Sequence, residues 1–107
     1  MRVEFGSKSE ERCFGARRRA RILAVGEVLG ADARARGAMS CELYAMSYFQ
    51  GGVYGAMISM FVDGIPSLTG YSARCLAGTR SKAIDAVIVA LEELIQDPIF
   101  LMNIRAR

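Results

Sequence analysis

The sequence predicts an α+β domain in which a three-stranded antiparallel meander is flanked by an N-terminal and a C-terminal helix, in the order α-β-β-β-α. The spacing of apolar residues is helical from residue 16 to 36, alternates from residue 39 to 62, and is helical again after residue 79. Asp63-Gly64 is a strong hairpin signal. Helices on one sheet face would make two layers and helices on opposite faces three. Both arrangements stay open, because the first two strands are apolar on both faces.

The first fifteen residues are the least determined part of the chain. Residues 2–5 fit either a short strand or a flexible start. Ser7 followed by Glu10 matches a capping box. In this motif the serine oxygen accepts a hydrogen bond from the backbone N–H three residues later, and the glutamate carboxylate accepts one from the backbone N–H of the serine. This spacing predicts that a helix begins after Ser7.

A longer helix is expected from Ala16 to Arg36. Its apolar residues recur at three- and four-residue steps, namely Ile22, Val25, Leu29 and Ala33. Gly26 and Gly30 leave one face nearly without side chains, so tight packing against the domain's own sheet is expected there. Gly37 is a suitable C-terminal stop.

Three strands are expected between the helices. Residues 39–49 and 54–62 form the first two, joined by a turn at residues 50–52. The third runs from about Ser67 to Cys75, and Pro66 at its start indicates an edge or first-residue position. Gly78 is expected to close the sheet.

The last helix lies within residues 77–95, with Thr79 or Ser81 as its N-cap. It ends before Pro98, because proline disfavours helical conformation in the residue that precedes it. Its apolar stripe consists of Ile84, Val87, Ile88, Leu91, Leu94 and Ile95. The apolar tail within residues 98–107 is expected to fold back on the core, and burial in a partner is the alternative.

This last helix is charged against its own dipole. Arg80 and Lys82 occupy its first turn, whereas Glu92, Glu93 and Asp97 stand near its end. Each cation at a helix N-terminus and each anion at its C-terminus lowers the stability of the helix by about 0.3 kcal/mol or more. An anionic partner at the N-terminus would offset that cost, so the pattern predicts an anion-binding site there.

Length and composition indicate one domain spanning residues 1–107 with a real core, since 52% of the residues are hydrophobic. The net charge is +3, but it is unevenly distributed. Seven arginines fall between residues 12 and 36, against two acidic residues. A local basic excess of this kind favours nucleic acid, anionic lipid or an acidic protein face as the partner.

The residue types argue against catalysis and metal binding. The chain has no histidine, and its three cysteines have wide spacings without a Cys-x-x-Cys pair. It also lacks a Gly-x-Ser-x-Gly motif and a phosphate-binding loop with Lys-Ser or Lys-Thr. We therefore expect a non-enzymatic protein with no cofactor and no metal, and free thiols in a reducing cytoplasm.

Two segments resemble membrane or export signals. Residues 43–62 carry no formal charge and are long enough to span a bilayer. Their glycines, Gln50 and alternating apolar residues favour strands instead. The run of arginines at residues 17–21 begins too late for a secretory signal, and Glu27 lies in the apolar segment that follows. We therefore expect no membrane association.

The α-β-β-β-α order resembles a double-stranded-RNA-binding domain, and so do residues 78–83, Gly-Thr-Arg-Ser-Lys-Ala, which open an Ala-rich helix. The resemblance implies that fold and a phosphate-binding start to the last helix, with Ser81 and Lys82 at the family's Ser-Lys positions. Ala83 stands where the family has a second lysine, and Asp85 lies near the third. The family's Gly-Pro-x-His loop is replaced by residues 50–53.

The same region is also similar to small bacteriophage proteins of the α-β-α sandwich type, through Thr79 and the segment 83–87, Ala-Ile-Asp-Ala-Val. Many such proteins inhibit host defence systems by occupying a functional surface, anti-CRISPR proteins among them. That resemblance implies a non-enzymatic inhibitor that docks on a host protein or ribonucleoprotein.

These observations lead to one set of expected contact residues, shared by two binding hypotheses: Arg17, Arg18, Arg19, Arg21, Arg74, Arg80 and Lys82. The partner is a host protein or ribonucleoprotein, and the alternative is RNA held by its phosphates. Tyr44, Tyr48 and Tyr54 would then stack bases on a sheet face, although cross-strand pairing explains them more simply. A homodimer joined by the apolar tail or a sheet edge is a third possibility.

Overall fold

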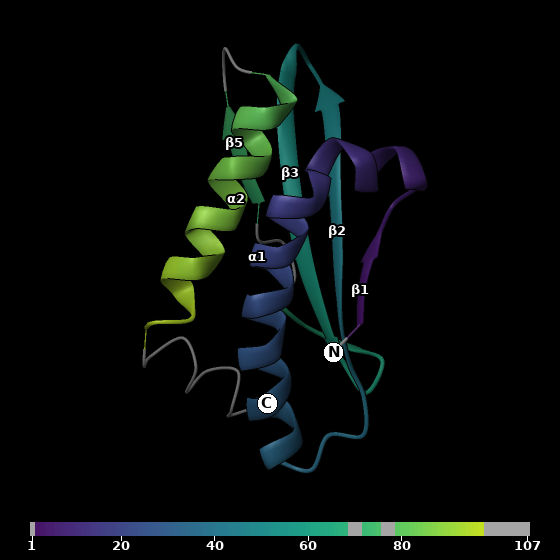
Figure 1. Ribbon diagram of the computed structural model, residues 1–107, viewed down its shortest axis with the longest axis vertical. Helices are drawn as coiled ribbons and strands as arrows, with labels where there is room; N and C mark the ends of the chain where they lie inside the picture. Colours follow the sequence, from purple (N-terminus) through teal and green to yellow (C-terminus); the bar gives the residue numbers. More distant parts are fainter. Residues whose placement is uncertain (1, 69–71, 76–78, 98–107) are drawn as a thin grey trace.

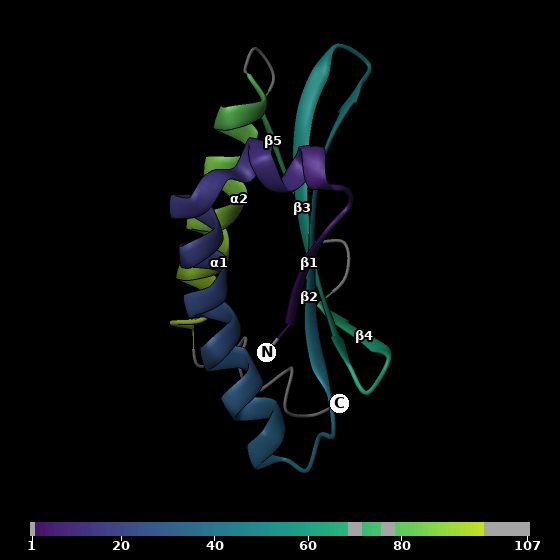
Figure 2. The ribbon, with the colours of Figure 1, turned by 45° about the vertical axis from the view of Figure 1, so that its right-hand side comes forward.

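A computed structural model describes residues 2–68, 72–75 and 79–97 of the chain (Figure 1). The elements, in chain order, are β1 (Arg2–Phe5), α1 (Lys8–Ala35), β2 (Cys41–Gln50), β3 (Val53–Val62), β4 (Ile65–Leu68), β5 (Ser72–Cys75) and α2 (Arg80–Leu94). The α+β class is confirmed. Both helices lie on the same side of the sheet (Figure 2), so the domain has two layers and the three-layer alternative is wrong.

The sheet is mixed, which corrects the predicted antiparallel meander. β1 lies parallel to β2, with Val3 opposite Leu43, and so adds a strand ahead of the first helix. Val3 and Phe5 pack against the core, which explains why this short segment is held in the sheet. The layout is therefore β-α-β-β-β-β-α rather than α-β-β-β-α.

The predicted third strand is divided in two. β4 and β5 both pair antiparallel with β3, β4 along its last residues and β5 along its first. Pro66 lies in β4 at the edge of the sheet, opposite Phe61, where a missing N–H is tolerated. Gly78, expected to close the sheet, lies outside the described residues.

Both predicted hairpin turns are confirmed. Gly51 and Gly52 join β2 to β3 with φ values of 60° and 78°, and Asp63 and Gly64 join β3 to β4 with φ values of 51° and 78°. Two successive positive φ angles match the twist of the flanking strands. The Asp63 carboxylate also accepts hydrogen bonds from the backbone N–H groups of residues 39 and 40, each at 2.8 Å. The turn therefore also anchors the chain entering β2.

Helix α1 begins at the predicted cap but bends inside. The Ser7 hydroxyl oxygen accepts a hydrogen bond from the Glu10 N–H at 3.1 Å. The Glu10 carboxylate bonds elsewhere, accepting from the Ser47 N–H at 3.1 Å, so the serine half of the capping box is confirmed and Glu10 ties α1 to β2 instead. Gly15 has φ 81° and ψ 165°, which divides α1 into segments 8–14 and 16–35. The second segment matches the predicted helix.

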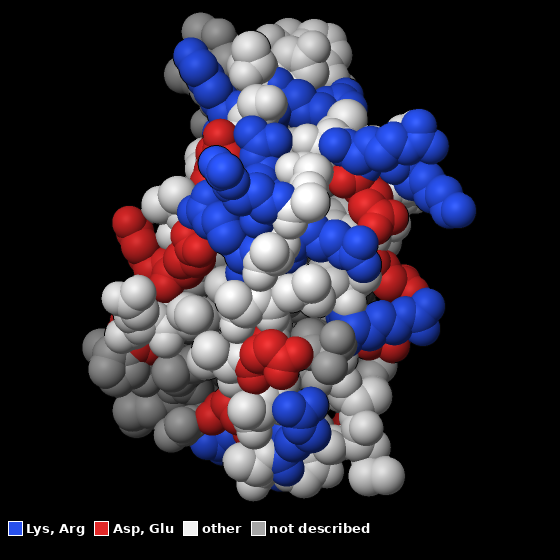
Figure 3. Space-filling model, viewed as in Figure 1, with Lys and Arg blue, Asp and Glu red and all other residues white. Residues whose placement is uncertain are grey.

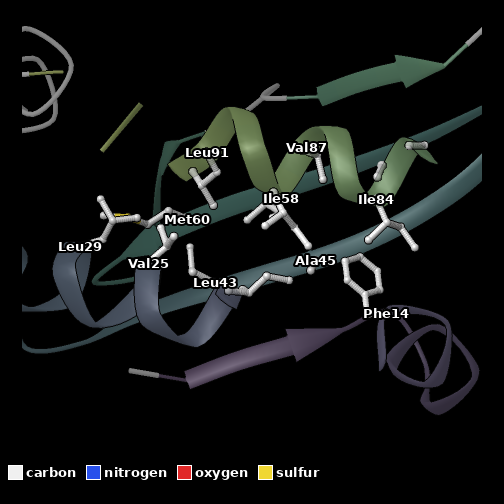
Figure 4. Close-up of a cluster of buried hydrophobic side chains, with 14 residues drawn as sticks. Phe14, Val25, Leu29, Leu43, Ala45, Ile58, Met60, Ile84, Val87 and Leu91 are labelled. Carbon is white, nitrogen blue, oxygen red and sulfur yellow. The ribbon is translucent and has the colours of Figure 1, made fainter. Parts of the chain in front are cut away.

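The core lies between the helices and the sheet (Figure 4). Its largest fully buried side chains are Phe14, Ile22, Leu29, Leu43, Ile58, Met60, Ile84, Val87, Ile88 and Leu91. Each such side chain contributes about 1.5–3 kcal/mol of burial free energy. The predicted stripe of α2 is confirmed in its first four members, while Leu94 and Ile95 are only partly buried. Gly26 and Gly30 are both buried.

Candidate binding surface

Arg18 joins three parts of the molecule. Its Nε and Nη2 atoms donate to the two carboxylate oxygens of Asp85 on α2, at 2.7 and 3.2 Å. Its Nη1 atom donates to the carbonyl oxygens of Cys13 and Phe14, at 3.2 and 3.4 Å. These carbonyls end the first segment of α1, so one guanidinium braces the bend at Gly15 and fastens α2 to it.

Arg21 makes a second two-point contact with α2. Its Nε and Nη2 atoms donate to the Glu92 carboxylate at 3.1 and 2.5 Å. The hydrogen bond from Arg21 lowers the pKa of the Glu92 carboxyl, and the bond from Arg18 lowers that of Asp85. Two acidic residues of α2 are therefore paired with arginines of α1. Because Arg18 and Arg21 are engaged within the chain, their role as partner contacts has no support from the geometry.

Arg17 and Arg19 lie just after the bend. Arg19 Nη1 lies 3.0 Å from the Glu11 carboxylate, an ion pair that crosses the bend and leaves the arginine side chain 51% exposed. Arg17 is exposed and forms no ion pair within the described part of the chain. Both side chains are accessible to a partner.

Arg80 and Lys82 lie in the first turn of α2. Thr79 is the N-cap, with its hydroxyl oxygen accepting from the Lys82 N–H at 3.3 Å, which confirms one of the two predicted caps. Arg80 Nη1 lies 3.7 Å from the Cys13 sulfur, so the start of α2 contacts the first segment of α1. Lys82 is exposed and has no ion-pair partner among the described residues.

Arg74 does not belong with the others. It pairs in register with Gly55 of β3, whereas Arg17, Arg80 and Lys82 lie on the two helices. The predicted contact set is therefore shared between the sheet and the helices.

The structure adds two cations that the sequence analysis did not select, Lys8 and Arg12. Together with Glu11, Gly15, Ala16 and Arg19 they line a notch of about 500 Å³ at the bend of α1. The capping signal at Ser7 indicated a helix around Lys8 and Arg12. The bend at Gly15 had no signal of its own, because a glycine inside a helical pattern is usually accommodated without a break.

Six cations thus gather around the bend and the start of α2. We call this surface the basic band: Lys8, Arg12, Arg17, Arg19, Arg80 and Lys82. Figure 3 shows lysine and arginine side chains concentrated over the half of the helical face where the first segment of α1 and the start of α2 lie, with few over the other half. Clustered like charge of this kind attracts a negatively charged partner.

Tyr44, Tyr48 and Tyr54 do not share a sheet face, so they do not form the single stacking surface that the RNA hypothesis would use. In register, Tyr44 lies opposite Ser59 and Tyr48 opposite Gly55, on the side away from the helices. The Tyr48 ring covers Gly55, where an added Cβ would lie 2.2 Å from it. Tyr54 is on the helical side and contacts Phe49, with ring centroids 4.8 Å apart.

The other chemical groups are few in the described part of the chain. Cys13 is exposed and Cys41 is partly buried, and burial raises the pKa of the Cys41 thiol. No group of three or more potential metal ligands occurs within residues 2–68, 72–75 and 79–97. Among the same residues, no helix combines the length and the apolar character that crossing a membrane requires. The predicted apolar tail, residues 98–107, lies outside the described residues.

Comparison with known proteins gave no match to a family model, a curated protein or a solved structure.

Proposed function

We propose that this chain is a small non-enzymatic binding protein that acts in the cytoplasm by docking its basic band on an acidic surface of a host protein or ribonucleoprotein. Occupying that surface would inhibit the partner, as the resemblance to small phage inhibitors implies. The observation that supports the proposal is the convergence of cations from two helices at the bend of α1. Lys8, Arg12, Arg17 and Lys82 form no ion pair within the described residues.

The ion pairs behind the band support the same function. Arg18 and Arg21 hold α2 against α1, so the exposed cations of the two helices keep a constant relative position. A surface whose charges are already positioned loses less conformational entropy on binding than one that must be ordered. Charge complementarity of this kind raises association rates and selects partners.

Charge reversal tests the proposal. The double variant Arg12→Glu with Lys82→Glu changes one unpaired cation on each helix, and Arg34→Glu, at the far end of α1, makes a single reversal outside the band. In affinity capture from the native host, with and without nuclease, we expect the wild type and Arg34→Glu to retain the same partner and the double variant to lose it. Equal capture by all three proteins would overturn the proposal.

A second candidate function is binding of double-stranded RNA. One observation favours it: the β2–β3 turn, the first segment of α1 and the start of α2 all lie toward the same end of the molecule (Figure 1). The β2–β3 turn and the start of α2 stand where the family that the sequence resembles has its Gly-Pro-x-His loop and its phosphate-binding helix start. Phosphate contacts release counterions, so binding of an RNA duplex should weaken steeply as salt is raised. Salt-insensitive capture of one protein partner would exclude this candidate.

A further inference from the structure

An exposed aromatic pair lies beside the basic band. Phe49 and Tyr54 are opposite each other at the end of the β2–β3 hairpin, with their rings tilted by 52° and 4.8 Å between centroids. Phe49 is 58% exposed. The guanidinium carbon of Arg80, a member of the band, lies 5.8 Å from the centroid of the Tyr54 ring. The hairpin end and the start of α2 therefore form one surface.

The position of this pair is set by the fold. Tyr54 packs against the buried core, which fixes its ring, and Phe49 rests on it from the neighbouring strand. Arg80 is held between the Tyr54 ring and the Cys13 sulfur. The surface thus combines a prepositioned aromatic platform, in which the exposed Phe49 ring rests on Tyr54, with a cation that follows the N-cap of α2.

We propose that the exposed ring of Phe49, supported by Tyr54 and Arg80, stacks on an unpaired nucleobase, while Lys82 and the cations at the bend hold the adjoining phosphates of a single-stranded RNA. Proteins bind single-stranded nucleic acids through two features, exposed aromatic rings and a positively charged surface. The rings stack on the flat faces of the bases, and the cations attract the negatively charged phosphates. An acidic protein segment would satisfy the cations but would leave the platform unused. Bases within a duplex are already stacked and would not reach it.

This inference rests on the proposed docking function and specifies which part of a ribonucleoprotein partner the band meets. The test uses fluorescence anisotropy with an oligouridine of about twelve nucleotides and an abasic oligomer of the same length and charge. We expect the wild-type protein to bind oligouridine more tightly, and Phe49→Leu to weaken oligouridine binding about tenfold without changing abasic binding. Phe61→Leu, the same substitution on the opposite sheet face, should change neither affinity.

Two results would overturn the nucleobase site: equal affinity of the wild type for both oligomers, or unchanged oligouridine affinity in Phe49→Leu. Polyglutamate serves as an acidic-protein probe, and an equal loss of polyglutamate binding in Phe49→Leu would assign the platform to protein. Lys82→Glu separates this inference from the docking proposal. If Lys82→Glu weakens binding of both oligomers but Phe49→Leu weakens neither, the band stands and the nucleobase site falls. If neither variant weakens binding of either oligomer, the nucleobase site falls, and the affinity capture of the charge-reversal variants alone decides the docking proposal.

Discussion

Arg18 of α1 and Asp85 of α2 meet in a two-point contact, with Nε–Oδ1 at 2.7 Å and Nη2–Oδ2 at 3.2 Å. The Arg18 side chain is 22% exposed and that of Asp85 51% exposed, so the pair lies at the rim of the helix–helix contact. With the Arg21–Glu92 pair, it matches two of the acidic residues of α2 with cations from another helix.

The Arg18–Asp85 contact should contribute measurably to stability. Because Asp85 is half exposed, solvent screening limits the gain, and we expect Asp85→Asn to lower the free energy of unfolding by about 1 kcal/mol. Urea denaturation monitored by circular dichroism would measure this change. Glu93→Gln, at an exposed position further along the same helix with no ion pair among the described residues, is the matched control. An equal loss in both variants would show that net charge, and not the contact, is responsible.

The same pairs predict a loss of stability in acid. The pKa values of Asp85 and Glu92 are lowered below 3.8 and 4.5 in the folded chain by their hydrogen bonds to arginine. A lowered folded-state pKa means that the unfolded chain binds protons first, so the stabilisation is present above the ordinary pKa values and is lost as the pH falls through the folded values. Urea midpoints should therefore fall below about pH 4.5. The double variant Asp85→Asn with Glu92→Gln should show a shallower fall, and identical pH profiles would contradict this account.

Gly15→Ala should destabilise the fold through the backbone alone. The conformation at Gly15, φ 81° and ψ 165°, is accessible almost only to glycine, and a Cβ built there would meet no atom within 4 Å beyond its chain neighbours and the adjoining helix backbone. We expect a loss of about 1–3 kcal/mol in the free energy of unfolding, measured by thermal or urea denaturation. Increased stability of the variant would indicate that α1 is straight in solution.

Gly55 and Tyr48 should be energetically coupled. A Cβ at Gly55 would lie 2.2 Å from the Tyr48 ring, so Gly55→Ala must displace the ring, at a cost of about 1–3 kcal/mol. Removing the ring in Tyr48→Ala should make the second substitution much less costly. A double-mutant cycle of unfolding free energies measures this interaction. Additive losses would mean that the ring does not rest on Gly55.

Local signals in the sequence were sufficient for several elements. Thr79 as a cap, Asp63-Gly64 as a turn and the apolar stripe of α2 each depend on neighbouring residues alone, and the structure contains all three. For β1 the sequence left a short strand and a flexible start both open, because a four-residue segment carries little periodicity and its parallel partner, β2, lies beyond a whole helix. The bend at Gly15 depends on tertiary contacts.

The residues of the candidate site also divide into those that the local sequence indicates and those that only the tertiary structure brings together. The sequence identified Arg80 and Lys82 because a cation at a helix N-terminus is a local anomaly. It could not separate Arg18 from Arg17, since the partner of Arg18 is 67 residues away. Lys8 and Arg12 join the site only through the bend, and Phe49 joins only through its register with Tyr54.

The four hydrogen bonds of Arg18 also limit which residue could replace it. Three different nitrogen atoms reach acceptors on Cys13, Phe14 and Asp85, so the geometry of the fork, and not only the positive charge, is needed. Lysine, with one nitrogen, could keep the carboxylate or the carbonyls but not span both. The angle of the bend and the position of α2 therefore both depend on the Arg18 side chain, for which no conservative substitute exists.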